Sequence, residues 1–151
     1  MVIMPTILKN KDKTIELLEQ LELYYLSNIN RASNGQRLER RSQNLFYTLI
    51  GDAAGGDSED MPWDDEVAQA GLSKVQELNE KYGAPIFNFV YRRRAYSEGE
   101  GCWLGYERKR GAILHFNDLL LGNTSKEEKQ KRFRCESITQ WLTANEGRRR
   151  A

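Results

Sequence analysis

The residues best able to do chemistry lie at positions 103–117, where cations and glycines precede an expected helix: Trp103-Leu104-Gly105-Tyr106-Glu107-Arg108-Lys109-Arg110-Gly111-Ala112-Ile113-Leu114-His115-Phe116-Asn117. At a helix start, free backbone N–H groups and the positive end of the helix dipole add to the charge of lysine and arginine side chains. Together they suit a phosphate, and a diphosphate in particular. A solvated basic helix start has the same composition, so composition alone leaves both interpretations open.

The other reactive side chains indicate no second site. His115 is the only histidine and lies beside an apolar helical stripe, where packing or exposure is commoner than catalysis. The acids within 57–65 lack the fixed spacing of a calcium loop, so capping and solvation explain them. Cys102 and Cys135 have no metal-ligand spacing and are expected to be ordinary reduced thiols. We expect no metal site; among the tryptophans only Trp103 has some weight as a stacking surface.

The elements that position these residues begin with a short strand and a long helix. Residues 2–8 are apolar, but Pro5 cannot donate to a central ladder, so the strand is expected to end at about Met4. Apolar residues at helical spacing predict a helix from Asp12, a possible cap, through Leu26.

A second strand and an acidic loop come next. Residues 29–41 are polar, basic and aperiodic, which predicts a mobile loop. The aromatic and branched residues 45–50 predict a strand buried on both faces, ending at Asp52. The loop 52–65, with glycines, a proline and several acids, is long enough to do more than connect two elements.

Glycines mark the ends of the later elements. A helix is expected up to Tyr82, capped by an aspartate at position 64 or 65 and ended by Gly83. Residues 86–91 predict a third strand, followed by an arginine run and a glycine-rich turn at 99–105.

The C-terminal part is less determined. A helical stripe through Phe116 ends at Gly122, and Ser125 with Glu128 forms a capping box for a last element. That element is either a helix throughout or one that breaks near 133–135 into a short strand, and the sequence does not decide between them.

Strands alternating with helix-length crossovers imply a mostly parallel sheet with helices on both sides. We therefore expect one α/β, Rossmann-like domain over residues 1–151, with an exposed sheet edge through which a homodimer could form. Ligands in such sheets bind beyond the carboxyl ends of the strands, so Pro5, Thr6, Asp52 and the segment after Tyr91 are the positions to weigh.

Charge and hydropathy restrict the class of partner. Lysine and arginine (23) nearly balance aspartate and glutamate (22), which argues against nucleic acid. The arginine runs at 92–94, 108–110 and 148–150 nevertheless keep a nucleic-acid-binding or non-catalytic interaction module as the alternative. No apolar run reaches the roughly 20 residues that span a bilayer, and no signal peptide is evident, so a cytoplasmic location is expected.

The stretch 103–117 resembles a signature of the glycosyltransferase segment of cyclic beta-1,2-glucan synthases, Trp-x-Gly-Trp/Tyr-Glu-Arg-Lys-Arg-Gly-x-Leu/Ile-x-x-Phe/Leu-Asn. Pro5-Thr6 after the first strand is similar to the entry strand of that family. The strand that ends at Asp52 and the segment 78–83 before the third strand are similar too, so the resemblance covers most of the chain.

The resemblance implies a GT-A type fold and a hexosyltransferase that uses UDP-glucose to build and cyclise a beta-1,2-glucan, within a membrane-associated parent protein. It implies that Pro5 and Thr6 shape the uracil and ribose pocket, that Asp52 accepts hydrogen bonds from the nucleotide, and that Asn117 lies near it. By the same resemblance Lys109 and Arg110 face the diphosphate, with Trp103 as a modest contributor.

The chain departs from the family at two places. Ala53-Ala54 stands where an aromatic residue and a second acid are expected, and the Asp-x-Asp motif that holds a divalent metal does not occur. The resemblance therefore implies a truncated, nucleotide-sugar-binding half of a glycosyltransferase that is inactive alone. It implies no catalytic residue or cofactor in this piece, and Mg or Mn in the full enzyme.

Overall fold

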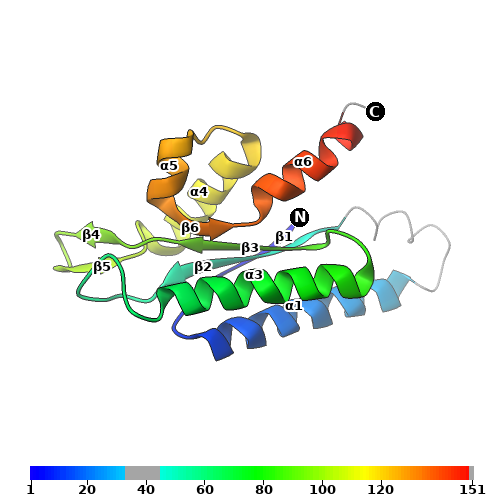
Figure 1. Cartoon of the computed structure of the whole chain (residues 1–151), viewed down its shortest axis with the longest axis horizontal. Helices are drawn as coiled ribbons and strands as arrows, with labels where there is room; N and C mark the ends of the chain where they lie inside the picture. The colour runs from blue at the N-terminus through cyan, green and yellow to red at the C-terminus, as the bar shows by residue number, and fades with distance from the viewer. Residues whose placement is uncertain (33–44, 150–151) are drawn as a thin grey trace.

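The computed structural model describes residues 1–32 and 45–149 as a layered α/β structure (Figure 1). Its central sheet has the strand order β1-β2-β3-β6, with β1 (Val2–Leu8), β2 (Tyr47–Ala53) and β3 (Phe87–Arg92) parallel to one another. The short strand β6 (Phe133–Glu136) is antiparallel to β3. The expected α/β class with a mostly parallel sheet is thus confirmed.

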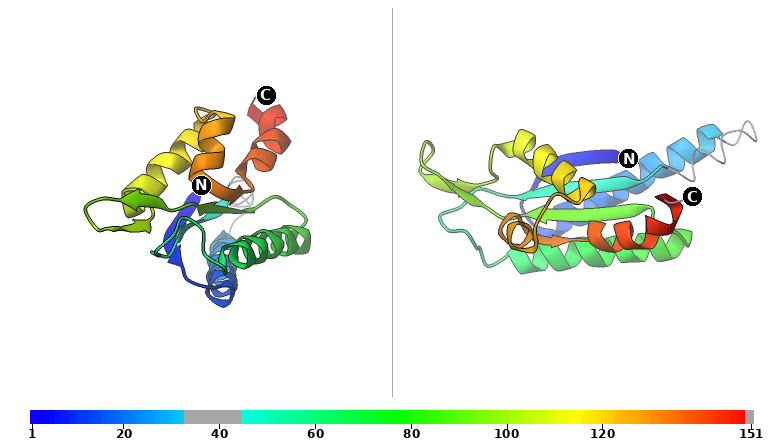
Figure 2. Two further views of the ribbon diagram at one scale, coloured as in Figure 1. Left: turned by 60° about the vertical axis from the view of Figure 1, so that its left-hand side comes forward. Right: turned by 90° about the horizontal axis from the view of Figure 1, so that it is seen from above.

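Helices cover both faces of this sheet, as Figures 1 and 2 show from different directions. Helices α1 (Lys11–Ala32) and α3 (Asp64–Tyr82) lie on one face. The other face carries α4 (Arg108–Leu121), α5 (Lys126–Arg132) and α6 (Ile138–Arg149). A hairpin of β4 (Ala95–Ser97) and β5 (Cys102–Leu104) projects from one end of the sheet. The glycine-rich turn predicted at 99–105 is therefore shorter than expected, because residues 102–104 form β5.

The first two elements differ from their predicted limits. Strand β1 continues through Pro5 to Leu8, so the expected end at Met4 is wrong. β1 is an edge strand that pairs only with β2 among the described residues, and an edge strand tolerates a proline because one of its sides needs no ladder donors. Asn10, rather than Asp12, caps α1, because its Oδ1 accepts the Lys13 N–H at 2.8 Å.

The glycine signals at the helix ends are confirmed. Gly83 and Gly122 both have left-handed backbone angles (φ 65° and 76°) and donate N–H groups back to the last turn of α3 and α4. The capping box of Ser125 and Glu128 starts α5 as expected. The chain then breaks into β6, which resolves the choice left open for residues 133–135.

The predicted loop at 29–41 is wrong for its first four residues. Residues 29–32 are the last turn of α1, and the remainder of the predicted loop lies outside the described residues. Strand β2 is buried along its whole length, as predicted, and continues to Ala53.

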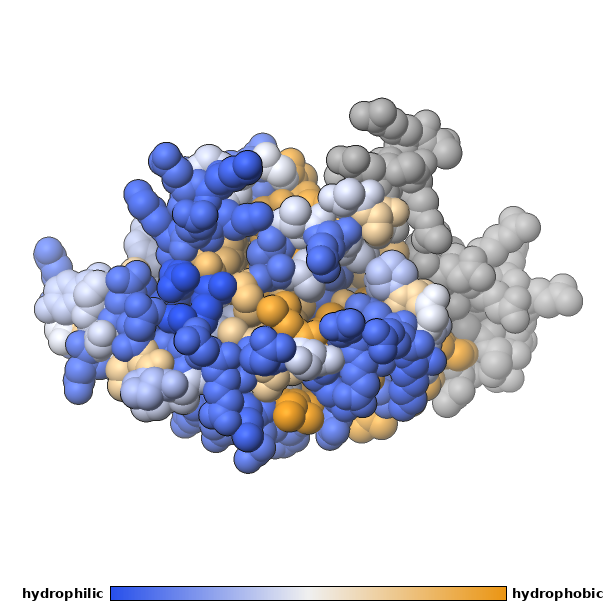
Figure 3. Space-filling model, viewed as in Figure 1, coloured by the Kyte–Doolittle hydropathy of each residue, from blue (hydrophilic) through white to orange (hydrophobic). Residues whose placement is uncertain are grey.

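Two apolar clusters on opposite faces of the sheet form the core. Leu49, Phe87 and Phe89 pack toward α1 and α3, whereas Ile50 and Val90 pack toward α4 and α6. The face in Figure 3 is mainly hydrophilic with small apolar patches. Within the described residues, no helix combines the length and apolarity that a membrane crossing requires.

Side chains close the edge of β3 that the short β6 leaves uncovered. Asn79 of α3 accepts the N–H groups of Ile86 and Phe87 at 3.0 and 2.8 Å and donates to the Phe87 carbonyl at 3.0 Å. Ser137 accepts the Phe89 N–H at 2.9 Å through its hydroxyl. These contacts satisfy backbone groups that would otherwise be an open template for another strand.

Candidate functional site

A cavity of about 580 Å³ opens at the carboxyl ends of β1 and β2, where ligands of parallel sheets usually bind. Its lining includes Pro5, Thr6, Asp52, Glu100, Arg108 and Lys109. Four residues predicted from the sequence, Pro5, Thr6, Asp52 and Lys109, are therefore brought together although they come from three different elements.

A buried ion pair closes the floor of this cavity. Arg92, at the end of β3, donates from Nε to Asp52 Oδ1 at 2.5 Å and from Nη2 to Asp52 Oδ2 at 2.8 Å. Both residues are almost inaccessible, with 1% and 6% of their surface exposed. Asp52 is thus held in place by a charge-assisted, bidentate contact, and its charge is already compensated before any ligand arrives.

The same arginine fixes a strained turn before α4. Arg92 Nη2 donates to the carbonyl oxygens of Tyr106 and Arg108 at 3.2 and 3.0 Å. Glu107 and Arg108 both have left-handed backbone angles, with φ of 49° and 50°. Side chains other than glycine rarely adopt this conformation, and it persists where surrounding contacts enforce it, often at functional sites.

Two glycines of the signature make room for this turn. A Cβ atom at Gly105 would lie 2.6 Å from Asp52 Oδ2, and one at Gly111 would lie 1.8 Å from the Tyr106 carbonyl oxygen. The two glycines of the pattern 103–117 are therefore explained by close packing against the Asp52 and Arg92 pair and the Tyr106 backbone.

We predict that Gly111→Ala displaces this turn. The added methyl group collides with backbone, which cannot swing away as a side chain would, so we expect a loss of about 1–3 kcal/mol in the free energy of unfolding. Urea titration measures this value. Gly99→Ala is the control, since a Cβ there meets nothing within 4 Å, and equal losses in the two variants would contradict the packing argument.

His115 packs behind the site and does not face the ligand cavity. Its Nδ1 lies 3.0 Å from Arg92 Nη1, and its ring stacks on Tyr106 with 5.8 Å between ring centroids. Because a guanidinium group can only donate, Nδ1 must accept, which requires an unprotonated nitrogen there. Burial, followed by the charges of Arg92 and Arg132, lowers the pKa of His115 to about 4, so it is neutral at pH 7.

The cations of the signature divide by position. Lys109 lines the cavity, and no ion pair of Lys109 is found among the described residues. Arg110 is not among the lining residues; its side chain is 79% exposed and lies 3.9 Å from Glu107. Arg108, which the resemblance did not single out, lines the cavity in its place.

Asn117 and Trp103 also lie outside the cavity lining. Asn117 is exposed further along α4. Trp103 belongs to β5, bonds through its backbone to Gly56 and packs edge-on against Tyr96. Trp103 therefore ties the hairpin to the loop after β2.

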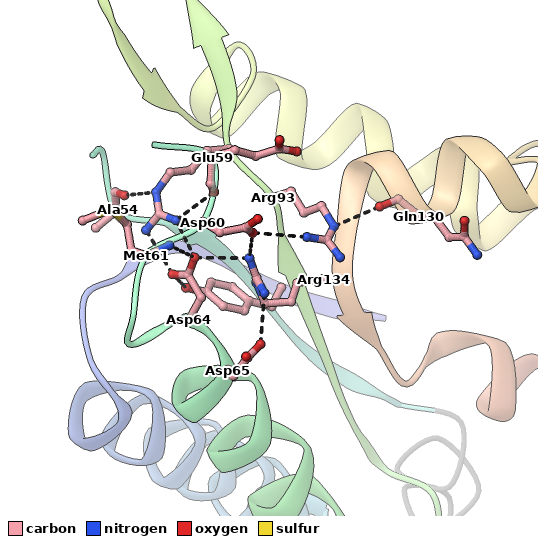
Figure 4. Close-up of polar contacts among 11 residues, drawn as sticks. Ala54, Glu59, Asp60, Met61, Asp64, Asp65, Arg93, Gln130 and Arg134 are labelled. Atoms are coloured by element: carbon pink, nitrogen blue, oxygen red, sulfur yellow. Dashed lines mark hydrogen bonds and ion pairs between the residues drawn. The ribbon is translucent and has the colours of Figure 1, made fainter. Parts of the chain in front are cut away.

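A second ionic cluster, shown in Figure 4, holds the acidic loop 54–63. Arg94 donates to Asp64 at 2.6 and 3.1 Å and to the carbonyl oxygens of Ala54 and Glu59. Arg134 of β6 bonds to Asp60 and Asp64 and, at 3.0 Å, to Asp65. The loop after β2 is thus fastened to the segment that follows β3, to α3 and to β6.

Asp64 belongs to this cluster and is not the N-cap of α3, although an aspartate at position 64 or 65 was predicted to cap that helix. The N-cap residue is Trp63, which makes no side-chain capping bond. The Asp64 carboxylate accepts the Met61 N–H at 2.8 Å and the Arg94 contacts, and only 1% of Asp64 is exposed. Charge neutralisation of a buried arginine therefore determines the position of Asp64.

Sequence reasoning placed Arg92 only within the segment after Tyr91 and Arg108 only within the basic stretch 103–117, and it missed Glu100. Arg92 is the last residue of the fully buried strand β3, which places it at the ligand end of the sheet. The contact between Glu100 and Arg108 carried no sequence signal, because it depends on how the hairpin folds back toward α4.

The described residues do not suit a divalent metal. They contain no group of three or more histidine, cysteine, aspartate or glutamate side chains that could hold one. The two carboxylates in the cavity lining, Asp52 and Glu100, each accept from an arginine. Hard cations need several free oxygen ligands, so the donor set present here does not fit Mg or Mn.

A larger cavity of about 850 Å³ lies between α3 and α6, away from the carboxyl ends of β1 and β2. Its lining has amide and hydroxyl side chains and the acids Glu80 and Glu136, but no lysine or arginine. A phosphate needs cationic or N–H donors. This cavity therefore fits a nucleotide less well than the cavity of about 580 Å³ at the ends of β1 and β2 does.

The comparisons with known proteins point to one relative. No known protein-family profile matches the chain. The cyclic beta-(1,2)-glucan synthase of Rhizobium meliloti strain 1021 is 32% identical to it over 126 residues, which are 82% of the chain. The chain spans only 4% of the length of that synthase. The resemblance first seen in the signature at 103–117 is thus confirmed by similarity over most of the chain.

Proposed function

We propose, given that this chain is homologous to a segment of a cyclic beta-(1,2)-glucan synthase, that it is the sugar-nucleotide-binding part of a glycosyltransferase and that its ligand is UDP-glucose. The observation that carries the proposal is the cavity at the ends of β1 and β2 with Lys109 and Arg108 in its lining. Its volume of about 580 Å³ lies within the range usual for small-molecule sites.

The base, the ribose and the diphosphate of the ligand each have a complementary part of the cavity. Pro5 and Thr6 on β1 offer a partly apolar wall for the uracil and ribose. Lys109, in the first turn of α4, supplies a cation for the diphosphate, supported by the positive end of the helix dipole. In a transfer reaction these groups would stabilise the charge that develops on the departing UDP.

We propose binding without transfer for this piece. The sequence contains no Asp-x-Asp motif, and the carboxylates of the cavity are bound to arginines. A GT-A type fold for the whole enzyme, with Mg or Mn acting on the diphosphate, belongs to the same proposal.

A nucleic-acid interface is the weaker candidate function. Arg92 and Arg94, two members of one arginine run, are buried in ion pairs with Asp52 and Asp64. The third, Arg93, contacts Asp60 and the Gln130 carbonyl. This run is therefore occupied by internal contacts and does not offer a basic surface for phosphates.

Calorimetric titration with UDP tests the proposal. We expect Lys109→Gln to weaken UDP binding about tenfold or more, since a hydrogen bond to a charged group contributes about 1.5–3 kcal/mol. Arg110→Gln removes a cation from the next position, outside the cavity, and should change the affinity less than about threefold.

The same protein should be titrated with single-stranded RNA at several salt concentrations. Steeply salt-dependent RNA binding, with no UDP binding, would contradict the proposal. Equal effects of Lys109→Gln and Arg110→Gln would show that UDP binds elsewhere.

A further inference from the structure

The mouth of the ligand cavity contains an ion pair within the protein. Arg108 Nη2 donates to both carboxylate oxygens of Glu100, at 2.7 and 2.8 Å. Both residues line the cavity of about 580 Å³, and both also line a neighbouring hollow of about 430 Å³ that includes Tyr96 and Tyr106. The Glu100 and Arg108 pair therefore stands between two hollows.

The two partners are anchored very differently. The backbone of Arg108 is held by Arg92, which donates to its carbonyl oxygen at 3.0 Å, and it starts α4. Glu100 lies in the turn of the β4–β5 hairpin, next to Gly101 with its left-handed φ of 65°. The carboxylate, carried by a narrow and exposed hairpin turn, is thus the partner that can move.

Opening this pair costs little. The side chains of Arg108 and Glu100 are 67% and 48% exposed. Ion pairs in such positions contribute about 1 kcal/mol or less. A ligand anion that offers Arg108 a stronger contact can therefore displace the carboxylate.

The distribution of charge in the cavity indicates that a ligand anion displaces the Glu100 carboxylate. Among the acids in the cavity lining, Asp52 is neutralised by buried Arg92, whereas Glu100 keeps Arg108 from any other anion. When Glu100 leaves, Arg108 and Lys109 both face the cavity as cations. A diphosphate oxygen can accept from the guanidinium nitrogen that the carboxylate now occupies.

We propose that Arg108 is a diphosphate-binding residue and that Glu100 is an internal anion that occupies it until the ligand's phosphate replaces the carboxylate. This inference rests on the proposed function, because it assigns how the same cavity admits its nucleotide. Displacement of Glu100 also joins the two hollows, and it makes the phosphate, not the base, the part of the ligand that opens the site.

The test compares UDP and uridine binding, by calorimetry, in matched variants of the full chain. Glu100→Gln removes the competing charge and should tighten UDP binding by up to about fivefold, which corresponds to the about 1 kcal/mol that an exposed pair contributes. Uridine has no phosphate, so its affinity should not change. Glu98→Gln, in the same exposed turn, is the control and should leave both affinities unchanged.

Arg108→Gln, alone and combined with Glu100→Gln, makes this test a double-mutant cycle. It should weaken UDP binding about tenfold, and adding Glu100→Gln to it should produce no further gain. If the wild type binds UDP but Glu100→Gln leaves the affinity unchanged or weakens it, this inference is wrong. The proposed function would still hold in that case. Absence of UDP binding in the wild type and in all variants would overturn both.

Discussion

Replacing Arg92 by glutamine should lower the free energy of unfolding by about 3–5 kcal/mol, because it leaves the Asp52 carboxylate buried without its cation. The variant also loses the bonds from Arg92 to the Tyr106 and Arg108 carbonyls, which hold the strained turn before α4. We therefore expect UDP binding to fall together with stability. Urea titration monitored by circular dichroism measures the first effect, and calorimetry measures the second.

Arg93→Gln is the matched control for this variant. Arg93 is adjacent in sequence, but its contact with Asp60 at 3.4 Å lies at the surface, and such pairs contribute about 1 kcal/mol or less. Similar losses in the two variants would contradict the claim that the buried pair organises the site.

Asp64→Ala should be destabilising to a similar degree, about 3–5 kcal/mol, because it leaves the fully buried side chain of Arg94 without a counter-charge. The change also removes the acceptor of the Met61 N–H, so the loop 54–63 should loosen. Hydrogen exchange of the loop amides measures this loosening alongside urea titration. Asp65→Ala is the control, because the Asp65 side chain is 93% exposed and its ion pair among the described residues is with the more accessible Arg134.

The pH dependence of the Asp64 effect has a definite sign. Burial alone would raise the pKa of Asp64, but hydrogen bonds from Arg94 and the Met61 N–H, with the charges of Arg94 and Arg134, lower it from the usual 3.8. A carboxylate with a lowered pKa stabilises the fold above its unfolded-state value and loses that contribution as pH falls. The stability gap between wild type and Asp64→Ala should therefore be complete above pH 3.8 and shrink below it. A gap that is constant through this range would contradict the assignment.

The sequence predicts the fold where local chemistry is decisive. Gly83 and Gly122 end helices because they adopt left-handed angles, and Ser125 starts one because its hydroxyl and Glu128 satisfy free N–H groups. These features need only residues close together in the chain. The α/β class follows from the same local alternation of strands and helices.

The candidate site is less predictable because its contacts are distant in sequence. The three consecutive arginines at 92–94 suggest exposed side chains, because arginine is rarely fully buried unless it is paired with an acid. Arg92 and Arg94 are instead buried by Asp52 and Asp64, which lie 40 and 30 positions earlier in the chain. Pairings of this kind depend on the order of strands in the sheet, which no local pattern contains.

The sequence also did not show which of the neighbouring cations 108–110 would line the cavity. The resemblance pointed to Lys109 and Arg110 together, but only Lys109 and Arg108 line the cavity. Gly105 and Gly111 permit this orientation of α4, because a side chain at either position would collide with Asp52 or with the Tyr106 carbonyl. The glycines are visible in the sequence, whereas the close approach of Gly105 to Asp52, 53 positions earlier, is not.

The most direct test of the nucleotide site is a titration of the ¹⁵N-labelled chain with UDP, followed by nuclear magnetic resonance. Thr6, Ala53, Gly55 and Lys109 line the cavity of about 580 Å³. We predict that their amide signals shift most and saturate together. Shifts centred on Gln76, Ser137 and Thr139 of the larger cavity, or no shifts at all, would contradict the proposed donor site.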